Sequence, residues 1–345
     1  MSPIKHLTLL LLLLVTLLPG VVEAGGKKGV HGKLQERSVY TEDDILIRPV
    51  LNVPVASIGK LGLTLDKPFN RIKAIRQLFP GRYYHLSRNE DIDDKLDLIV
   101  WKSKNYRTKP FPGWFLDELP EVFPYSMGNI TQAGQTLTFT DDSGHKHLIF
   151  SFASHPLGSI DDLGNGRYSC VIMGLAWFKE ENNKWVLKHF APGIGCYGSF
   201  KTLPPIHLTK LGTNNYGIYI HNSNGGPGQV YYSTLYIHAI VDGQFKMVLK
   251  EDDVERYNTM SSTWYSQIVS LKSPVTNGFQ PLLLKLDGEF KRYTSYPEYD
   301  TTDSPIELRN AIIGKDSFNF RVSRRFEYSN GKYRKVSAKY KVKKG

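Results

Sequence analysis

Apolar and polar residues recur with two different periods along the chain, and the change of period divides it. Over residues 69–79 apolar residues return at spacings of three and four, and Pro80-Gly81 follows them. This pattern predicts a helix with Pro68 in its first turn that ends before the Pro-Gly pair. Short strand-like runs lie on both sides of it: 46–58, 82–86 and 96–101. We therefore expect residues 45–131 to form a small α+β module.

From residue 132 onward the period changes to two, which is typical of strands. Turn residues separate the runs at intervals of about 8 to 15 residues, as in all-β domains. The predicted strands are residues 148–152, 168–177, 185–190, 216–220, 230–240, 245–249, 268–271, 282–286, 318–322 and 333–342. Residues 132–345 are therefore expected to form a β-repeat domain.

A short motif recurs in this domain: a pair of turn residues, a long polar residue and an aromatic residue. Its four copies are Asn182-Asn183-Lys184-Trp185, Asp242-Gly243-Gln244-Phe245, Asp287-Gly288-Glu289-Phe290 and Asn330-Gly331-Lys332-Tyr333. Asp-Gly and Asn-Gly pairs adopt the positive backbone angles of two-residue turns, so each copy predicts a hairpin. Repeats of about 45–60 residues with four strands each are typical of propeller blades. The predicted fold is mainly β with propeller-like repeats, and the alternative is a β sandwich.

The repeats over residues 135–345 resemble degenerate FG-GAP-type (integrin-like) β-propeller repeats of bacterial envelope proteins, whose loops often read Asp-x-Asn-Gly-Asp-Gly. The resemblance implies a propeller with loop carboxylates that bind Ca²⁺. In this chain Asp161 and Asp162 remain in one copy, whereas the other copies carry Thr, Asn or Lys. We therefore expect no Ca²⁺ and no other cofactor.

The amino terminus has the layout of a secretory signal peptide. Lys5 precedes an apolar run over residues 7–18, and Val22 and Ala24 are small residues at positions −3 and −1 of a cleavage after Ala24. An anchoring helix is the alternative, but the run is shorter than the about 20 apolar residues that span a bilayer. We expect a periplasmic or extracellular protein without a transmembrane segment in its mature chain. The predicted segments are a signal peptide over residues 1–24 and a flexible, Gly- and Lys-rich lead-in over residues 25–44.

Two cysteines, Cys170 and Cys196, lie in the mature chain. An oxidising compartment allows them to pair, and a loop of this length would then contribute about 3 kcal/mol to stability. A disulfide is therefore the prediction, and two buried free thiols are the alternative.

Candidate catalytic chemistry is sparse. The chain lacks Gly-x-Ser-x-Gly, His-Glu-x-x-His and Cys-x-x-Cys. His145 and His147 would share one face of a strand, a spacing that can hold a metal, but a third ligand is not evident and a solvated strand edge is the favoured interpretation. A glycosidase needs two carboxyl groups about 5 to 10 Å apart. The carboxylates considered for a polysaccharide hydrolase are Asp161, Asp162, Asp242 and Asp252.

The basic excess lies at the carboxyl end. The net charge is +11, and residues 301–345 hold 12 Lys and Arg against 4 Asp and Glu. In the last predicted strand four lysines are expected on one face, with Val336, Ala338, Tyr340 and Val342 on the other, buried face. The four lysines of this candidate binding surface are Lys335, Lys339, Lys341 and Lys343. Lysines also protect edge strands from aggregation, which is the alternative interpretation.

Together these features favour an exported, non-enzymatic binding protein of the cell envelope. Its expected partner is an anionic envelope component or another protein, because the basic face attracts negative charge. One version is a periplasmic immunity-type protein, by analogy of fold alone. A secreted polysaccharide hydrolase is the alternative. The predicted compartment argues against nucleic acid.

Overall fold

Strands that follow one another along the chain pair as antiparallel neighbours and build almost all of the structure. The computed structural model describes residues 45, 48–89, 92–104, 128–157, 170–199, 202–225, 231–258, 262–272, 275–291, 304–313 and 316–344. All of them belong to one unit, Ser38–Gly345. The signal peptide and the lead-in predicted for residues 1–24 and 25–44 lie outside the described residues.

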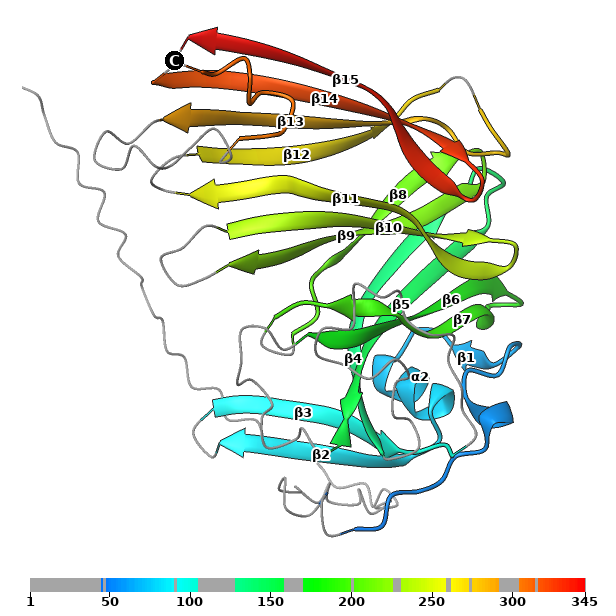
Figure 1. Ribbon diagram of the computed structural model, residues 1–345. Coiled ribbons are helices and arrows are strands. Elements are labelled where there is room, and N and C mark those ends of the chain that lie inside the picture. Colours follow the sequence, from blue (N-terminus) through cyan, green and yellow to red (C-terminus); the bar gives the residue numbers. More distant parts are fainter. Residues whose placement is uncertain are drawn as a thin grey trace, which may run out of the picture. The chain divides into compact units, whose positions relative to one another are not determined.

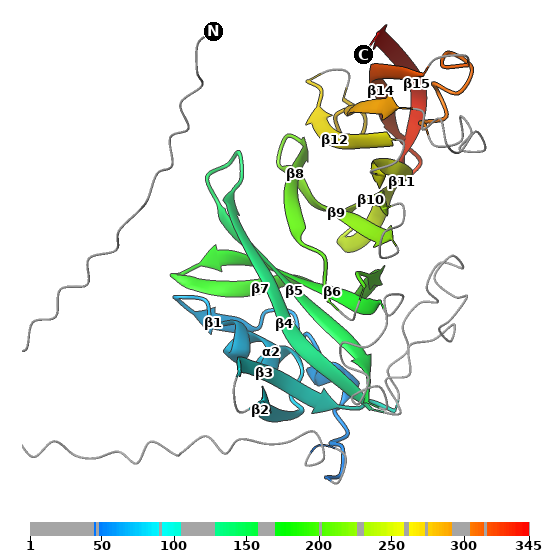
Figure 2. The same cartoon turned by 90° about the vertical axis from the view of Figure 1, so that its left-hand side faces the viewer.

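Three antiparallel meanders of four strands each form the larger part (Figures 1 and 2). Meander 1 contains β4 (Asn129–Thr140), β5 (Lys146–Pro156), β6 (Val171–Glu181) and β7 (Lys184–Tyr197). Meander 2 contains β8 (Ile206–Gly212), β9 (Asn215–Gly225), β10 (Tyr231–Val241) and β11 (Gln244–Asn258). Meander 3 contains β12 (Ser262–Ser270), β13 (Leu282–Lys291), β14 (Ser317–Ser329) and β15 (Lys332–Lys344). The mainly β class predicted from the alternation is confirmed.

Meanders 2 and 3 form one eight-stranded sheet, but the connection between them is short. β11 pairs with β12 only over Arg256–Asn258 opposite Ser262–Trp264, whereas the pairing inside each meander runs along most of its strands. The two meanders can therefore turn their faces toward one another. One apolar cluster accordingly takes residues from every strand of meander 3 and from β8, β10 and β11 of meander 2.

The central strands are largely apolar along their buried parts because both of their faces are covered there. In β6, Ile172 and Phe178 pack toward the side of the helix, whereas Met173 and Leu175 pack against meander 2. β10 contributes Ile237 to the core shared with meander 3. Each large apolar side chain buried in this way contributes about 1.5–3 kcal/mol. Four-stranded meanders stacked face to face are compatible with a propeller-like or a sandwich arrangement.

The amino-terminal elements join meander 1. They are the 3₁₀ turn η1 (Val55–Ser57), β1 (Thr64–Asp66), α2 (Arg71–Leu78), β2 (Arg82–Asn89) and β3 (Ile92–Trp101). β1 pairs with β7, and β2 and β3 continue the sheet beyond β4. The expected boundary between residues 131 and 132 falls inside β4, so strands from both sides of it share one seven-stranded sheet.

Two local predictions differ from the structure in this part. The helix begins at Arg71, because the Asn70 side chain accepts a hydrogen bond from the Lys73 N–H and caps it, so Pro68 precedes the first turn. Within residues 46–58 the described part contains the 3₁₀ turn and a single bridge from Asn52 to Lys102 instead of edge strands.

Three of the four predicted hairpin motifs are turns between strands. They are Asn182-Asn183, Asp242-Gly243 and Asn330-Gly331, and both residues of each pair have a positive φ. The prediction for Asp287-Gly288 is wrong, because this pair lies inside β13. A Cβ atom on Gly288 would clash with the Cβ of Trp264 and the carbonyl oxygen of Thr263. The glycine is needed there for close packing under the tryptophan and not for a turn.

Candidate binding surface

The outward-facing side chains of meander 3 form a polar surface, which we call the outer face of meander 3. In β14 the even-numbered residues from Phe318 to Tyr328 are buried, so the odd-numbered residues point outward. Side chains paired across neighbouring strands lie on the same face, and the register therefore extends this surface over all four strands. The first row holds Thr263, Glu289, Asn319 and Lys343, the second Tyr265, Asp287, Arg321 and Lys341, and the third Gln267, Lys285, Ser323 and Lys339.

A hollow of about 300 Å³ opens on this face. Its lining residues are Asp287, Asn319, Phe320, Arg321, Lys341 and Lys343. The Asp287 carboxylate pairs with the guanidinium of Arg321. Within the described ranges Lys341 and Lys343 form no ion pair. The hollow thus presents two uncompensated ammonium groups and one guanidinium shared with a carboxylate, and this set attracts anionic groups.

The sequence analysis found Lys341 and Lys343 but missed Arg321 and Asp287. Arg321 lies in a regular alternation of polar and apolar residues along β14, and this alternation is the signal that could have placed it on the outer face. Asp287 was assigned to a turn, and its position on the sheet follows only from the pairing with Arg321.

Lys335 does not share the face of the other three lysines. A register shift leaves Val336 as an extra residue in β15, so that Lys335 pairs with the buried Phe326 and Lys339 pairs with the outward Ser323. Such a bulge reverses which side chains point outward. The expected set of four is therefore corrected to three lysines on the outer face and one on the core side.

β15 also differs from the half-buried strand that we expected. Val336 is 51% exposed and Tyr340 is 50% exposed, and Ala338 between them is exposed as well. Only Val342 packs against the core, where it is partly buried. Both faces of the middle of β15 are thus open to solvent in the part of the chain that the structure describes.

Lys335 belongs to a buried charge cluster on the core side. The guanidinium of Arg324 donates two hydrogen bonds to the carboxylate of Glu307, of 2.8 and 3.0 Å, and its third nitrogen lies 3.0 Å from Glu251. Lys335 Nζ lies 3.1 Å from the same Glu251. Burial would raise the pKa of Glu307, but the hydrogen bonds and charge of Arg324 lower it below its ordinary value. This cluster connects β11, β14 and β15 and serves the fold.

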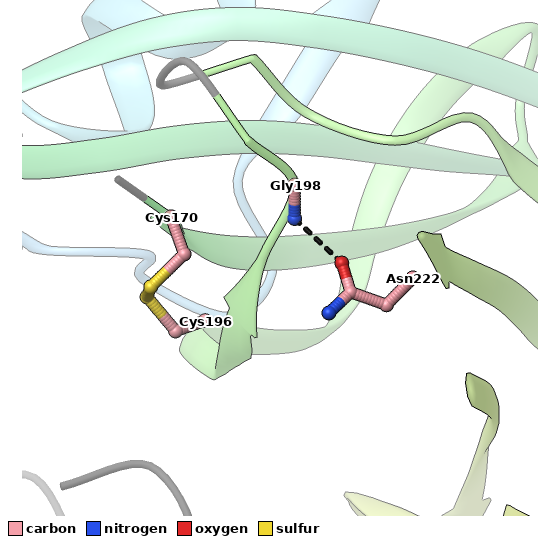
Figure 3. The surroundings of a disulfide bond; sticks show 4 residues. All are labelled: Cys170, Cys196, Gly198 and Asn222. Carbon is pink, nitrogen blue, oxygen red and sulfur yellow. Dashed lines mark hydrogen bonds between the residues drawn. A yellow bond between two sulfur atoms is a disulfide. The ribbon is translucent and has the colours of Figure 1, made fainter. Parts of the chain in front are cut away.

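The disulfide between Cys170 and Cys196 lies where the chain leaves meander 1 (Figure 3). The two Cα atoms are 5.5 Å apart, and Cys196 is the penultimate residue of β7. Two residues later, the Gly198 N–H donates a 2.7 Å hydrogen bond to the side-chain oxygen of Asn222 in β9. The covalent bond and this hydrogen bond together position the crossing from meander 1 to meander 2.

His147 lies in β5 and His145 precedes that strand, so the expected pair on one strand face is not formed, but both rings approach the carboxylate of Asp141, at 3.0 Å for His147 and 3.2 Å for His145. The Trp177 indole N–H donates to Nδ1 of His147 at 3.1 Å, so the proton of this ring is on Nε2 and is donated to Asp141. Burial would raise the pKa of Asp141, but the hydrogen bonds from His147, His145 and Ser143 lower it well below its ordinary value. Both nitrogens of His147 are engaged, which leaves it no lone pair for a metal.

The carboxylates considered for hydrolysis are not brought together in the described structure. Asp242 lies in the exposed turn between β10 and β11 and pairs with Lys246. Asp252 accepts a hydrogen bond from Thr234. Asp161 and Asp162 lie outside the described residues. Among the residues that are described, no group of three or more His, Cys, Asp and Glu side chains is placed to hold a metal.

The fold and the surface together define a mainly β protein with a basic outer face on its last meander. Comparison of the chain with protein-family models, curated proteins and solved structures gave no match. The resemblance to FG-GAP-type repeats therefore stays a prediction. Among the described helices, none has the length and apolar character needed to cross a bilayer.

Proposed function

We propose that this chain is an exported, non-enzymatic binding protein that holds an acidic partner on the outer face of meander 3. The observation that carries the proposal is the hollow in which Lys341 and Lys343, without an ion pair among the described residues, lie beside Arg321. These cations face outward on a meander whose opposite face is already committed to the core.

Edge protection alone does not account for this surface. Lysines that protect an edge strand are needed only on that strand, whereas Arg321 lies on β14, which is covered on both edges by β13 and β15. Lys285 of β13 adds a further cation to the same face, in the row of Lys339. Positive charge across three strands favours recognition of an extended anionic group.

Export is part of the proposal. It is supported by the signal-peptide layout of residues 1–24 and by the Cys170–Cys196 disulfide, because disulfides persist in oxidising compartments. The partner would then be an acidic component of the envelope or an exported acidic protein. The second case is the immunity-type version, in which the partner is an exported protein.

The test is binding of fluorescently labelled poly-glutamate, followed by anisotropy in about 0.1 M salt, where the Debye length is about 10 Å. The double substitution Lys341→Glu with Lys343→Glu reverses the charge of the hollow. It should weaken binding by about tenfold or more, which corresponds to about 1.4 kcal/mol. Rising salt should weaken binding to the native protein, because exposed charges are screened.

The matched control is Lys146→Glu with Lys184→Glu, which changes the net charge equally on meander 1, where both lysines are exposed. We expect this control to bind within about twofold of the native protein, since distant exposed charges are screened. Equal weakening in the two double variants would show that only the overall charge matters and would overturn the proposal.

A further inference from the structure

We propose that the acidic partner is a protein segment that adds an antiparallel strand to the free edge of β15. This inference rests on the proposed function and names the class of partner. β15 stands at the end of the strand order of its sheet and, among the described strands, pairs only with β14. An exposed strand edge offers a row of backbone donors and acceptors to an extended peptide.

The direction of the backbone groups follows from the hairpin that precedes β15. Asn330 and Gly331 form a two-residue loop with φ of 50° and 78°, closed by the pair of Ser329 and Lys332. Such a closing pair exchanges both of its backbone hydrogen bonds. Backbone direction alternates along a strand, so the odd-numbered residues of β14 direct their N–H and C=O groups toward β15.

The same alternation identifies the groups left at the free edge. Lys339, Lys341 and Lys343 pair with odd-numbered residues of β14, so their backbone groups are used inside the sheet. The residues between them direct N–H and C=O away from β14, toward the open edge. These edge-facing residues are Ala338, Tyr340 and Val342.

Side chains then specify the partner. The outer face along this edge carries the three lysines, and the other face carries Ala338 and Tyr340, both exposed. Paired side chains of adjacent strands lie on the same face. A partner strand should therefore alternate acidic residues, which meet the lysines, with apolar residues, which meet the alanine and the tyrosine.

A second copy of this chain fits the edge poorly. Antiparallel pairing of two β15 strands would place the three lysines of both copies on the same face of the joined sheet, where their like charges repel. The charge of the strand thus favours an acidic partner over self-association.

The probe is a seven-residue peptide, acetyl-Glu-Val-Glu-Val-Glu-Val-Glu-amide, measured by anisotropy against the native protein. In antiparallel pairing the valines lie opposite Ala338 and Tyr340 and direct their N–H groups toward β15, whereas the glutamates direct theirs away. Methylation of the three valine amide nitrogens should therefore weaken binding by about tenfold or more, since several backbone hydrogen bonds are lost. Methylation of the glutamate nitrogens should change binding by less than about threefold. A peptide of the same composition with its glutamates in one block should bind as weakly as the valine-methylated peptide.

A matched pair of protein variants tests the same contact from the other side. Ala338→Pro removes an edge-facing N–H without removing a bond to β14, and Ala338→Thr keeps that N–H. Only the proline variant should lose affinity for the alternating peptide, and both should bind poly-glutamate as the native protein does.

The outcomes separate this inference from the proposed function. Equal binding of the two methylated peptides would overturn strand addition. The proposed function would still stand if Lys341→Glu with Lys343→Glu weakened poly-glutamate binding by about tenfold or more. Preference for a sulfated polysaccharide over the alternating peptide would assign the face to another class of partner. A concentration-dependent dimer in sedimentation that Ala338→Pro abolishes would assign the edge to a second copy of the chain.

Discussion

At the scale of single residues, the buried contact between Tyr197 and His238 shows how burial decides a protonation state. The Tyr197 hydroxyl lies 2.7 Å from Nε2 of His238, and burial lowers the pKa of His238 to about 3. The imidazole is therefore neutral at ordinary pH, and the hydroxyl and the ring nitrogen share one hydrogen bond. Burial also raises the pKa of Tyr197 well above its ordinary value, so the pair stays uncharged over a wide range.

This contact predicts a pH dependence of stability. In the unfolded chain the histidine binds a proton below about pH 6.5, whereas in the folded chain it stays neutral down to about pH 3. The unfolded state binds more protons in this window, so the free energy of unfolding should fall by about 1.4 kcal/mol per pH unit from this residue as the pH decreases. Urea unfolding at several pH values measures the slope. His238→Gln should reduce it, and an unchanged slope in that variant would contradict the assignment.

Alanine substitutions at two glycines with similar backbone angles distinguish the cost of conformational strain from the cost of a steric clash. Gly198 has φ of +87° and Gly144 has φ of +82°. A Cβ atom on Gly198 would collide with the carbonyl oxygen of Thr202, whereas a Cβ on Gly144 meets no atom within 4 Å. Both substitutions to alanine should cost about 1 kcal/mol through the left-handed backbone. We expect Gly198→Ala to cost at least about 2 kcal/mol more, since backbone must move. Thermal unfolding of the two variants checks this, and equal losses would refute the clash.

Residue faces could be predicted from the sequence only where the strand is regular. The alternation correctly placed Lys339, Lys341 and Lys343 on one face, but it also included Lys335. The bulge at Val336 reverses the alternation, and it depends on how β15 pairs with β14. A pattern along one strand contains no information about that pairing.

At the scale of elements, β14 carries two arginine–carboxylate pairs that differ chiefly in exposure. Arg324 is 3% exposed and pairs with Glu307 on the core side, and Arg321 is 61% exposed and pairs with Asp287 on the outer face. Removing one member of a buried pair leaves the other charge without compensation, at a cost of several kcal/mol. An exposed pair contributes little, because water solvates both charges.

The two pairs therefore form a matched comparison. Glu307→Gln should lower the free energy of unfolding by about 3 kcal/mol, because the buried Arg324 then loses its two-bond carboxylate and retains only Glu251 as an anionic partner. Asp287→Asn should change it by less than about 1 kcal/mol. Chemical denaturation measures both, and similar losses in the two variants would show that burial does not govern the difference. Asp287→Asn should instead strengthen poly-glutamate binding, since it removes a negative charge from the hollow.

Local sequence also could not separate a turn from a strand at every element. Asp242-Gly243 and Asp287-Gly288 have the same letters and flanking aromatic, yet the first is a hairpin turn and the second lies within β13. The difference arises from Trp264 of the neighbouring strand, which packs where a side chain at Gly288 would be. Tertiary packing thus overrides a strong local signal.

At the scale of the whole molecule, exposure increases from the central strands to the last strand. β6 and β10 are covered on both faces by apolar clusters, whereas β15 is open on both faces over its middle. Strand positions were largely predictable from alternation, although β1, β4 and β8 were not found. The stacking of meanders was not specified by alternation, because it depends on which long-range faces pack together and on the short pairing between β11 and β12.

This gradient predicts a pattern of amide hydrogen exchange. Amides of β6 and β10 should exchange slowly, because only global unfolding exposes them. In β15 we expect Lys339 and Lys341, whose N–H groups bond to β14, to exchange at least about tenfold more slowly than Ala338 and Tyr340, whose N–H groups face the free edge. Residue-resolved exchange measured by NMR tests the alternation directly. Addition of the alternating Glu-Val peptide should slow Ala338 and Tyr340 and leave Lys339 and Lys341 almost unchanged. Protection spread evenly over these four amides would mean that the peptide covers the face of the strand without pairing to its edge.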